Sequence, residues 1–226
     1  MRFVWRCIFS VSCLAVIDPA LILASASPRR RDLLQQIGIV PALCLAADLD
    51  ETPAKGEVPR AHALRLALEK AHTIFAHQDV RQMKAPFLVL AADTVVAVGR
   101  RILPKAETEA EARACLKLLS GRAHRVYTAL VVIAQDGTKR TRVVETRVSV
   151  KHLAQDEIET YIASMEWQGK AGGYAIQGYA ARFVSALSGS YSGVVGLPLY
   201  ETAHLLKAAG LAGDRTSSQS EGRVRA

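Results

Sequence analysis

Residues 25–30, with the sequence SASPRR, carry side chains suited to binding an anion. A short apolar strand at residues 21–24 precedes them and a helix to about residue 37 follows, so they lie at a helix N-terminus. Free N–H groups and the helix dipole attract negative charge there, and hydroxyl and guanidinium groups add donors for phosphate oxygens. Arginines in a first helical turn are unfavourable against the dipole, so the pattern predicts an anionic ligand. The alternative is a capped helix with solvated arginines.

Asp93 is the second residue whose type and place suggest chemistry. It interrupts an otherwise apolar run at residues 87–98, FLVLAADTVVAV, which is typical of a strand buried on both faces. Burying a lone carboxylate is costly without a partner. The predicted partner is a metal ion, a lysine, or a water molecule that the carboxylate deprotonates. The alternative is an aspartate at a strand end that caps a turn.

Other charged residues extend both patterns. Asp48, Asp50 and Glu51 supply oxygen ligands of the kind that Mg²⁺ takes, although acidic loops are common. Lys70 and Lys105 are candidate phosphate contacts, although a lysine taken alone is more often a solvated surface residue.

A glycine-rich segment at residues 169–178, GKAGGYAIQG, would let backbone approach a ligand closely. The amide of Gln177 offers a donor and an acceptor together, which suits reading a base edge. A glycine-rich turn without a ligand is the alternative. Taken together, the phosphate-binding segment, the carboxylates, the lysines and the amide predict a nucleotide site and metal-assisted attack of water on phosphorus. The spacing of these residues does not show which phosphorus atom of the nucleotide is attacked.

The elements that must position these residues alternate between helix and strand. Strands are predicted at about residues 21–24, 87–98, 123–134, 139–150 and 182–187, and helices at about 28–37, 60–77, 108–119, 156–163 and 199–209. A turn at residues 136–137 joins the two long strands as a hairpin. This order predicts an α/β fold with a mixed sheet, in one domain over residues 21–210.

Composition excludes several classes of protein. Half of the 226 residues are hydrophobic and 22% are charged, which argues against general disorder, and no apolar run reaches the ~18–20 residues that cross a bilayer. The net charge of +8 suits an anionic partner. Cysteines at positions 7, 13, 44 and 115 form no CxxC pair, and the histidines have no ligand spacing, so neither a disulfide framework nor a zinc site is indicated. We expect a cytoplasmic protein.

The two ends of the chain differ from the rest. Residues 1–20 begin with two arginines and an apolar stretch, as a signal peptide does, but a strand follows immediately at residue 21. We therefore predict an unstructured or mis-assigned N-terminal extension, with export as the alternative. Residues 211–226 are rich in Ser, Gly and Arg and are predicted to be a disordered tail.

Across residues 21–210 the chain resembles the Maf family of nucleoside triphosphate pyrophosphatases. The segments that match are LILASASPRRRDLL, DLDET, LALEKA, LAADTVV, LSGRAHRVYTAL, KAGGYAIQG and VVGLPLYET. The resemblance implies an elongated mixed sheet flanked by helices, as in the inosine triphosphatase superfamily, with the site in a central cleft. It also implies hydrolysis of a nucleoside triphosphate to the monophosphate and pyrophosphate with a divalent cation, Mg²⁺ or Mn²⁺, and it allows a homodimer.

The resemblance also assigns roles to individual residues. Asp93 matches the catalytic carboxylate, described as the proton acceptor, and Glu51 matches the acidic residue that shares the metal with it. Residues that match the polar surroundings of the triphosphate are Ser25, Arg30, Lys70 and Lys105. One departure concerns the last of these: the family places proline after this lysine, whereas here the proline, Pro104, precedes it.

Three further positions separate branches of the family. The branch acting on dTTP and UTP has Arg, Thr and Gln, which are here Arg29, Thr94 and Gln177. The branch acting on 7-methyl-GTP tends to have Trp, Gln and Glu. We therefore predict a cytoplasmic dTTP/UTP pyrophosphatase that clears non-canonical or excess pyrimidine nucleotides, with no stable nucleic-acid partner and no membrane partner.

Two alternatives stay open at this point. One is a pyrophosphatase of the same family for a modified or purine triphosphate such as 7-methyl-GTP. The other is a basic, non-enzymatic regulator of septum formation that binds nucleic acid. That second alternative needs a continuous basic stripe with interleaved aromatics, whereas aromatics are 6% of this chain and the basic residues are scattered.

Overall fold

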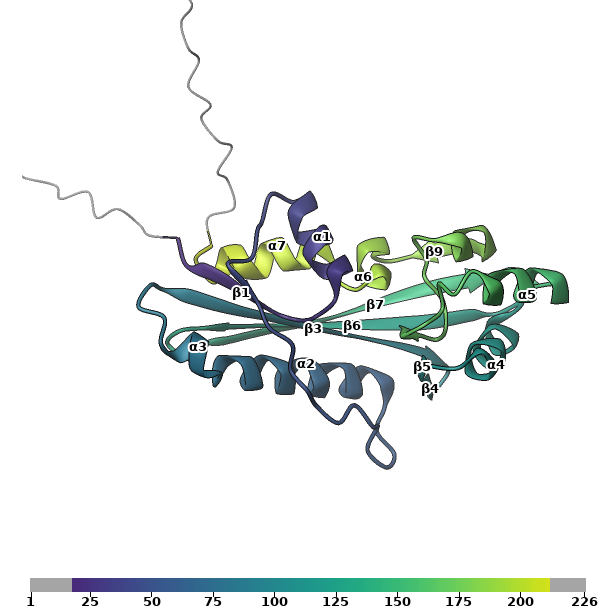
Figure 1. Ribbon diagram of the computed structural model, residues 1–226, viewed down its shortest axis with the longest axis horizontal. Helices are drawn as coiled ribbons and strands as arrows, with labels where there is room; N and C mark the ends of the chain where they lie inside the picture. The colour runs from purple at the N-terminus through teal and green to yellow at the C-terminus, as the bar shows by residue number, and fades with distance from the viewer. Residues whose placement is uncertain (1–17, 212–226) are drawn as a thin grey trace, which may run out of the picture.

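The computed structural model describes residues 18–211, and the predictions for residues 1–17 and 212–226 lie outside the described part. A seven-stranded mixed sheet runs the length of the molecule in the order β2-β1-β3-β6-β7-β9, with β4 paired to β3 (Figure 1). Its strands are β1 (Ala20–Ala24), β2 (Leu43–Cys44), β3 (Phe87–Val98), β4 (Arg101–Leu103), β6 (Ala123–Ala134), β7 (Lys139–Val150) and β9 (Val184–Ser188). A separate pair joins β5 (Lys105–Ala106) to β8 (Lys170–Ala171).

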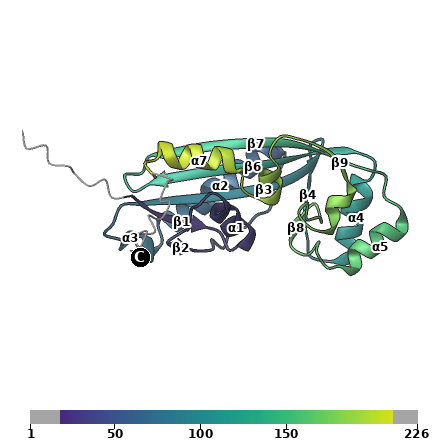
Figure 2. The ribbon, with the colours of Figure 1, turned by 90° about the horizontal axis from the view of Figure 1, so that it is seen from above.

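Helices cover both faces of the sheet. One face carries α1 (Pro28–Gln36), α6 (Tyr191–Val195) and α7 (Leu199–Ala208), and the opposite face carries α2 (Pro59–Phe75) and α3 (Gln78–Arg81) (Figure 1). At one end, α4 (Glu109–Leu119), α5 (Gln155–Ala163) and the 3₁₀ helix η1 (Tyr179–Phe183) pack beside β9 in a second lobe (Figure 2). The predicted mixed sheet flanked by helices is confirmed. Within residues 18–211 no helix is long and apolar enough to cross a membrane.

Three long strands connect the two lobes. β3, β6 and β7 are antiparallel neighbours of 12 residues each, and their side chains alternate between the faces. At the α2 face Val89, Ala91 and Val95 of β3 pack in one core cluster, while Leu88, Leu90 and Ala92 pack in another with α1 and α7. Asp93 and Thr94 are consecutive, so they point to opposite faces of the sheet.

One edge of β3 is left open in its middle. β1 pairs in parallel with β3 up to Ala91, and β4 pairs with β3 only from Val96 onward. Among the described strands, none lies opposite residues 92–95 on that edge. Asp93 and Thr94 therefore lie where this edge of β3, paired on either side of them, is accessible to a ligand.

Most predicted elements occur where the sequence placed them. The bounds of β3, β6 and β7 are confirmed, and Thr108 with Glu111 forms a capping box at the start of α4. The predicted strand start at residue 182 is wrong, because residues 179–183 form η1. The buried face of α2 follows Ala63, Ala67, Ala71 and Ile74, where small residues let the helix approach the sheet closely.

Candidate active site

A cavity of about 330 Å³ lies at the open edge of β3. The first turn of α1 lines it from one side, Asp93 and Thr94 of β3 from another, and the glycine-rich segment after β8 from the second lobe. Predicted site residues among its lining are Arg29, Arg30, Lys70, Asp93, Thr94, Lys105 and Gln177. The structure thus brings the acid in the apolar strand and the arginine-bearing helix tip to a single cavity.

Lys70 joins two carboxylates at the centre of the site. Its Nζ lies 2.5 Å from Oδ1 of Asp93 and 2.7 Å from Oε1 of Glu51. Both Lys70 and Asp93 are buried, with exposed fractions of 8% and 4%, so each charge has the partner that a buried ion needs. Of the three partners predicted for Asp93, the structure supplies the lysine. Within residues 18–211 the second oxygen, Oδ2, accepts no hydrogen bond.

Glu51 reaches the site from the loop between β2 and α2. Partial burial raises its pKa, but hydrogen bonds from Lys105 and Lys70, together with their charges, outweigh this and lower the pKa to about 2. Glu51 is therefore a carboxylate at any ordinary assay pH. Lys105 is half exposed, and its ion pair with Glu51 ties β5 to this loop.

Arg30 is a cation that lacks a carboxylate partner within the described residues. Its Nε donates to the carbonyl oxygen of Gly196 at 2.9 Å and its Nη1 donates to Oγ of Ser25 at 3.1 Å. Burial lowers the pKa of Arg30, the Asp93 charge raises it, and Arg29 lowers it again. Two neutral acceptors orient this guanidinium, and the charges of Asp93 and Glu51 act on it only from a distance, which leaves its remaining N–H groups open to an anion.

The serines of the SASPRR segment play different parts. Oγ of Ser25 accepts both from Arg30 and, at 3.1 Å, from the N–H of Ser27. Ser27 is the N-cap of α1 by position, but its hydroxyl makes no capping bond. Ser27 lines the cavity, whereas Ser25 lies just behind it and holds Arg30 in place.

The three residues that separate the branches of the family share this cavity. Burial lowers the pKa of Arg29, because the guanidinium loses hydration. Gln177 is exposed, and within the described residues its amide makes no hydrogen bond, so donor and acceptor are both open to a ligand. Oγ1 of Thr94 lies 3.2 Å from Oγ1 of Thr128, the residue opposite it on β6.

The larger acidic cluster suggested by Asp48, Asp50 and Glu51 does not form. Of the three, only Glu51 lines a cavity with Asp93, while Oδ1 of Asp50 accepts the N–H of Thr52 at 2.9 Å in a local turn. No group of three or more His, Cys, Asp or Glu side chains in residues 18–211 is arranged to hold a metal. Two carboxylates that meet at one ammonium do fit Mg²⁺, which is usually held by one or two carboxylates and substrate phosphates.

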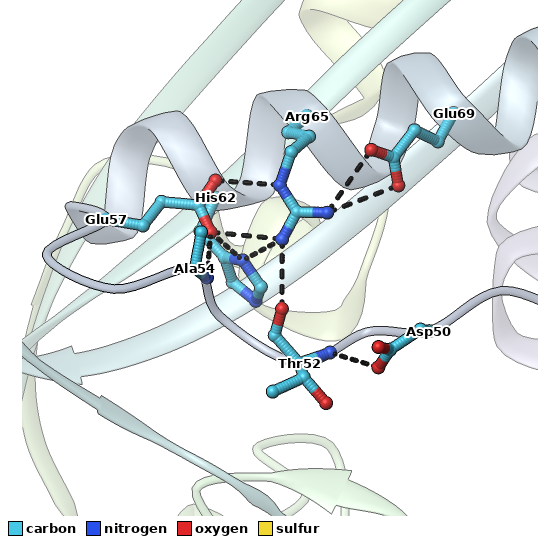
Figure 3. Close-up of polar contacts among 7 residues, drawn as sticks. All are labelled: Asp50, Thr52, Ala54, Glu57, His62, Arg65 and Glu69. Carbon is cyan, nitrogen blue, oxygen red and sulfur yellow. Dashed lines mark hydrogen bonds and ion pairs between the residues drawn. The ribbon is translucent and has the colours of Figure 1, made fainter.

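A hydrogen-bond network fixes the loop that carries Glu51 (Figure 3). Glu57 accepts from Nε of Arg65 at 2.8 Å, contacts Nδ1 of His62 at 2.9 Å and accepts the N–H of Ala54 at 3.0 Å. Arg65 also donates to the carbonyl oxygen of Thr52 at 3.1 Å. Both ends of the segment 52–57 are therefore tied to the first turns of α2, which limits the positions open to Glu51.

A second cavity of about 430 Å³ adjoins the first on the α2 side and shares Asp93, Thr94, Lys105 and Ala171 with it. Its remaining lining includes His62 and Leu66, which sequence reasoning did not select. Gly196, the acceptor for Arg30, was also missed, although it lies in the matching segment VVGLPLYET. Thr128 could have been found by the signal that marked Asp93, since it interrupts an apolar strand.

The glycine-rich segment is shaped by packing as well as by the cavity. A Cβ on Gly172 would lie 2.8 Å from Cγ1 of Val96, and one on Gly173 would lie 3.3 Å from Cα of Ala112. Both have positive φ, 68° and 66°. The close approach inferred from the sequence is thus made to β3 and α4 at these two positions, whereas Gly169 lines the cavity.

Gly172→Ala should lower the free energy of unfolding by about 2–4 kcal/mol, from left-handed strain plus overpacking against Val96. Urea denaturation measures this. Gly99→Ala is the matched control, because Gly99 has φ 60° with nothing within 4 Å of its Cβ position, so only strain, about 1–2 kcal/mol, is expected. Equal losses in the two variants would contradict the packing argument.

In an α/β fold, a helix N-terminus that follows a strand and carries two arginines is typical of proteins that bind phosphorylated ligands. The chain belongs to the Maf family: the family model for Maf-like protein matches residues 20–209. It is similar to the dTTP/UTP pyrophosphatase of Novosphingobium aromaticivorans, 61% identical over 86% of this chain and 94% of that protein. It is also similar to the dTTP/UTP pyrophosphatase of Caulobacter vibrioides, 60% identical over 85% and 96%. Among solved structures, a HAM1 protein from Coxiella burnetii is similar with a TM-score of 0.45 at 16% identity, over 84% of this chain and 99% of that one.

Proposed function

We propose that the protein is a nucleoside triphosphate pyrophosphatase that hydrolyses dTTP and UTP to the monophosphate and pyrophosphate. The observation that carries the proposal is the convergence of Asp93, Lys70 and Arg30 at one cavity, with Glu51 paired to Lys70 from the adjoining cavity. The names of the relatives at 60–61% identity support the same activity and the same pyrimidine substrates.

In this proposal each residue of the site has a separate role in the hydrolysis. Arg30, held by Ser25 and Gly196, binds phosphate oxygens, and Lys70 and Lys105 add positive charge around the triphosphate. Oδ2 of Asp93, which has no protein donor, accepts a proton from the attacking water. The new P–O bond forms as the α–β phosphoric anhydride breaks, and the leaving group is pyrophosphate.

A divalent cation, Mg²⁺ or Mn²⁺, is part of the proposal. Asp93 and Glu51 would hold it, because their oxygens already meet at a single cationic nitrogen. When bound, such an ion neutralises phosphate charge and polarises a P–O bond. Removal of the metal by a chelator should abolish turnover, and unchanged turnover would contradict this part of the proposal.

A substrate panel tests the activity directly. Pyrophosphate release is measured with Mg²⁺ and each common nucleoside triphosphate, and with 7-methyl-GTP. The highest kcat/KM is expected for dTTP and UTP. A preference for 7-methyl-GTP or a purine triphosphate would overturn the substrate assignment. Salt-sensitive DNA binding without any turnover would instead favour the non-enzymatic regulator.

Gln177→Glu should lower kcat/KM for dTTP and UTP roughly 10- to 100-fold, because a carboxylate loses the amide donor and adds negative charge beside the base. Inhibition by inorganic pyrophosphate should stay unchanged, since this ligand has no base. Gln168→Glu is the control, because it makes the same charge change at an exposed position just before this segment and outside the cavity lining. An unchanged substrate profile in Gln177→Glu would remove Gln177 as the reader of the base.

The proposal also includes a cytoplasmic location and a homodimer. Cys44 and Cys115, the two cysteines in the described residues, are free thiols, which suits a reducing compartment. Cell fractionation with an antibody tests the location. Sedimentation velocity tests the dimer, and a single monomer boundary at micromolar concentration would exclude a stable one.

A further inference from the structure

Thr128 lies behind the cavity, on β6, and does not line it. It is 1% exposed and is the register partner of Thr94 across the β3–β6 ladder. Its Oγ1 lies 2.7 Å from the carbonyl oxygen of Gly193, in α6, and 3.2 Å from Oγ1 of Thr94. These contacts form a chain from Thr94 through Thr128 to Gly193.

The direction of this chain is fixed by chemistry. A carbonyl oxygen only accepts, so the single hydroxyl proton of Thr128 is donated to Gly193. Thr128 then has only lone pairs to offer Thr94, and the proton of the Thr94 hydroxyl is donated to Thr128. Because that proton is taken, Thr94 presents only lone pairs to the cavity, and any ligand group that bonds to it must be a donor.

A hydroxyl group that can only accept hydrogen bonds discriminates uracil and thymine from cytosine. Uracil and thymine carry an N3–H donor, whereas the N3 of cytosine is an acceptor beside an amino donor. A lone pair of Thr94 would pair with the imide N–H of the first two bases and repel the N3 of cytosine. Thr94 lines the same cavity as Arg29 and Gln177, so all three can face one base.

We propose that Thr128 is a specificity-determining positioning residue: by donating to Gly193 it makes Thr94 an obligate acceptor for the imide N–H of uracil and thymine, and so excludes cytosine. This inference rests on the proposed function. It adds a residue that does not touch the nucleotide, and it states why a threonine in the cavity favours one pyrimidine class.

Thr128→Val tests the inference, because valine keeps the shape and removes the hydroxyl. Thr94 is then free to donate, so CTP should improve relative to UTP. The ratio of kcat/KM for UTP to that for CTP should fall about tenfold, the change expected for one hydrogen bond. Ki replaces kcat/KM where turnover is too slow to measure. Thr128→Ser keeps the hydroxyl and should keep the wild-type ratio.

The ratio of kcat/KM for UTP to that for CTP separates a change in the hydrogen-bonding role of Thr94 from a change in the shape of the cavity. Loss of the Thr128–Gly193 bond can displace α6, whose residues Val194 and Val195 line the cavity, and that displacement would weaken UTP and CTP alike. A folded Thr128→Val protein with an unchanged ratio overturns the inference while the proposed function stands. A wild-type protein that hydrolyses neither UTP nor dTTP overturns the proposed function and this inference with it.

A measurement on the wild-type protein decides the case if Thr128→Val does not fold. The N3–H of 5-fluoro-UTP is more acidic than that of UTP and is lost at lower pH. The KM for 5-fluoro-UTP should therefore rise with pH in a range where the KM for UTP is still flat. Parallel pH profiles for the two nucleotides would overturn the assignment of Thr94 as acceptor.

Discussion

Asp93→Asn is expected to release pyrophosphate from dTTP about 10²- to 10⁴-fold more slowly than the wild-type protein, the range for loss of a general base. Asparagine keeps the shape of aspartate but cannot take the proton of the attacking water. At saturating Mg²⁺ the effect should fall mainly on kcat, since Arg30, Lys70 and Lys105 remain to bind phosphate and Glu51 remains to hold the metal. Steady-state kinetics with dTTP and Mg²⁺ measures both constants.

The fold of this variant should survive, because Lys70 keeps its second partner. Oε1 of Glu51 lies 2.7 Å from the Lys70 nitrogen, so the buried ammonium is not left without a counter-charge. Asp79→Asn, at an exposed position on α3, is the matched control for the loss of one carboxylate and should leave turnover unchanged. Full activity of a folded Asp93→Asn protein would remove Asp93 as the base.

The second large effect is expected from Arg30→Met, which keeps the length of the side chain and removes the charge. Charge-assisted hydrogen bonds are worth about 1.5–3 kcal/mol, so kcat/KM for dTTP should fall by roughly 10- to 150-fold. The free energy of unfolding without ligand should change by less than about 1 kcal/mol. The lost bonds to Ser25 and Gly196 are offset by removal of a partly buried cation that makes no ion pair within the described residues.

Thermal denaturation with inorganic pyrophosphate separates binding from folding in this variant. Pyrophosphate should raise the Tm of the wild-type protein, as any ligand of the native state does, and should raise that of Arg30→Met much less. Arg31→Met is the control, because Arg31 is the exposed neighbour on the same helix. Equal stabilisation of the wild-type and Arg30→Met proteins by pyrophosphate would show that Arg30 does not bind the anion.

The sequence predicted the elements whose signals are strong and local. The apolar run of β3 and the alternation in β6 and β7 gave the correct bounds, since a 12-residue strand repeats its signal many times. The two-residue strands β2, β5 and β8 and the five-residue α6 are set by tertiary contacts, so their residues alone do not indicate them.

For the candidate site, residue type and sequence context were enough to select Asp93, a lone carboxylate in an apolar run, and the SASPRR segment at a helix start. Asp93 and the SASPRR segment come together because β1 stops pairing with β3 before residue 92 and β4 begins pairing only at residue 96. This strand pairing cannot be inferred from either segment alone. Gly196 and Thr128 were missed for a related reason. Each acts through a carbonyl or hydroxyl whose partner is 34 to 166 positions away in the chain.

The open stretch of β3 between the ends of β1 and β4 bears on aggregation. Exposed strand edges invite pairing with a strand of another molecule, and proteins commonly protect such edges with charge or by keeping them short. This edge spans residues 92–95, is set back in a cavity and has Arg29, Arg30 and Lys70 at its walls. The cations at the proposed active site therefore also disfavour intermolecular β-pairing at this stretch of β3.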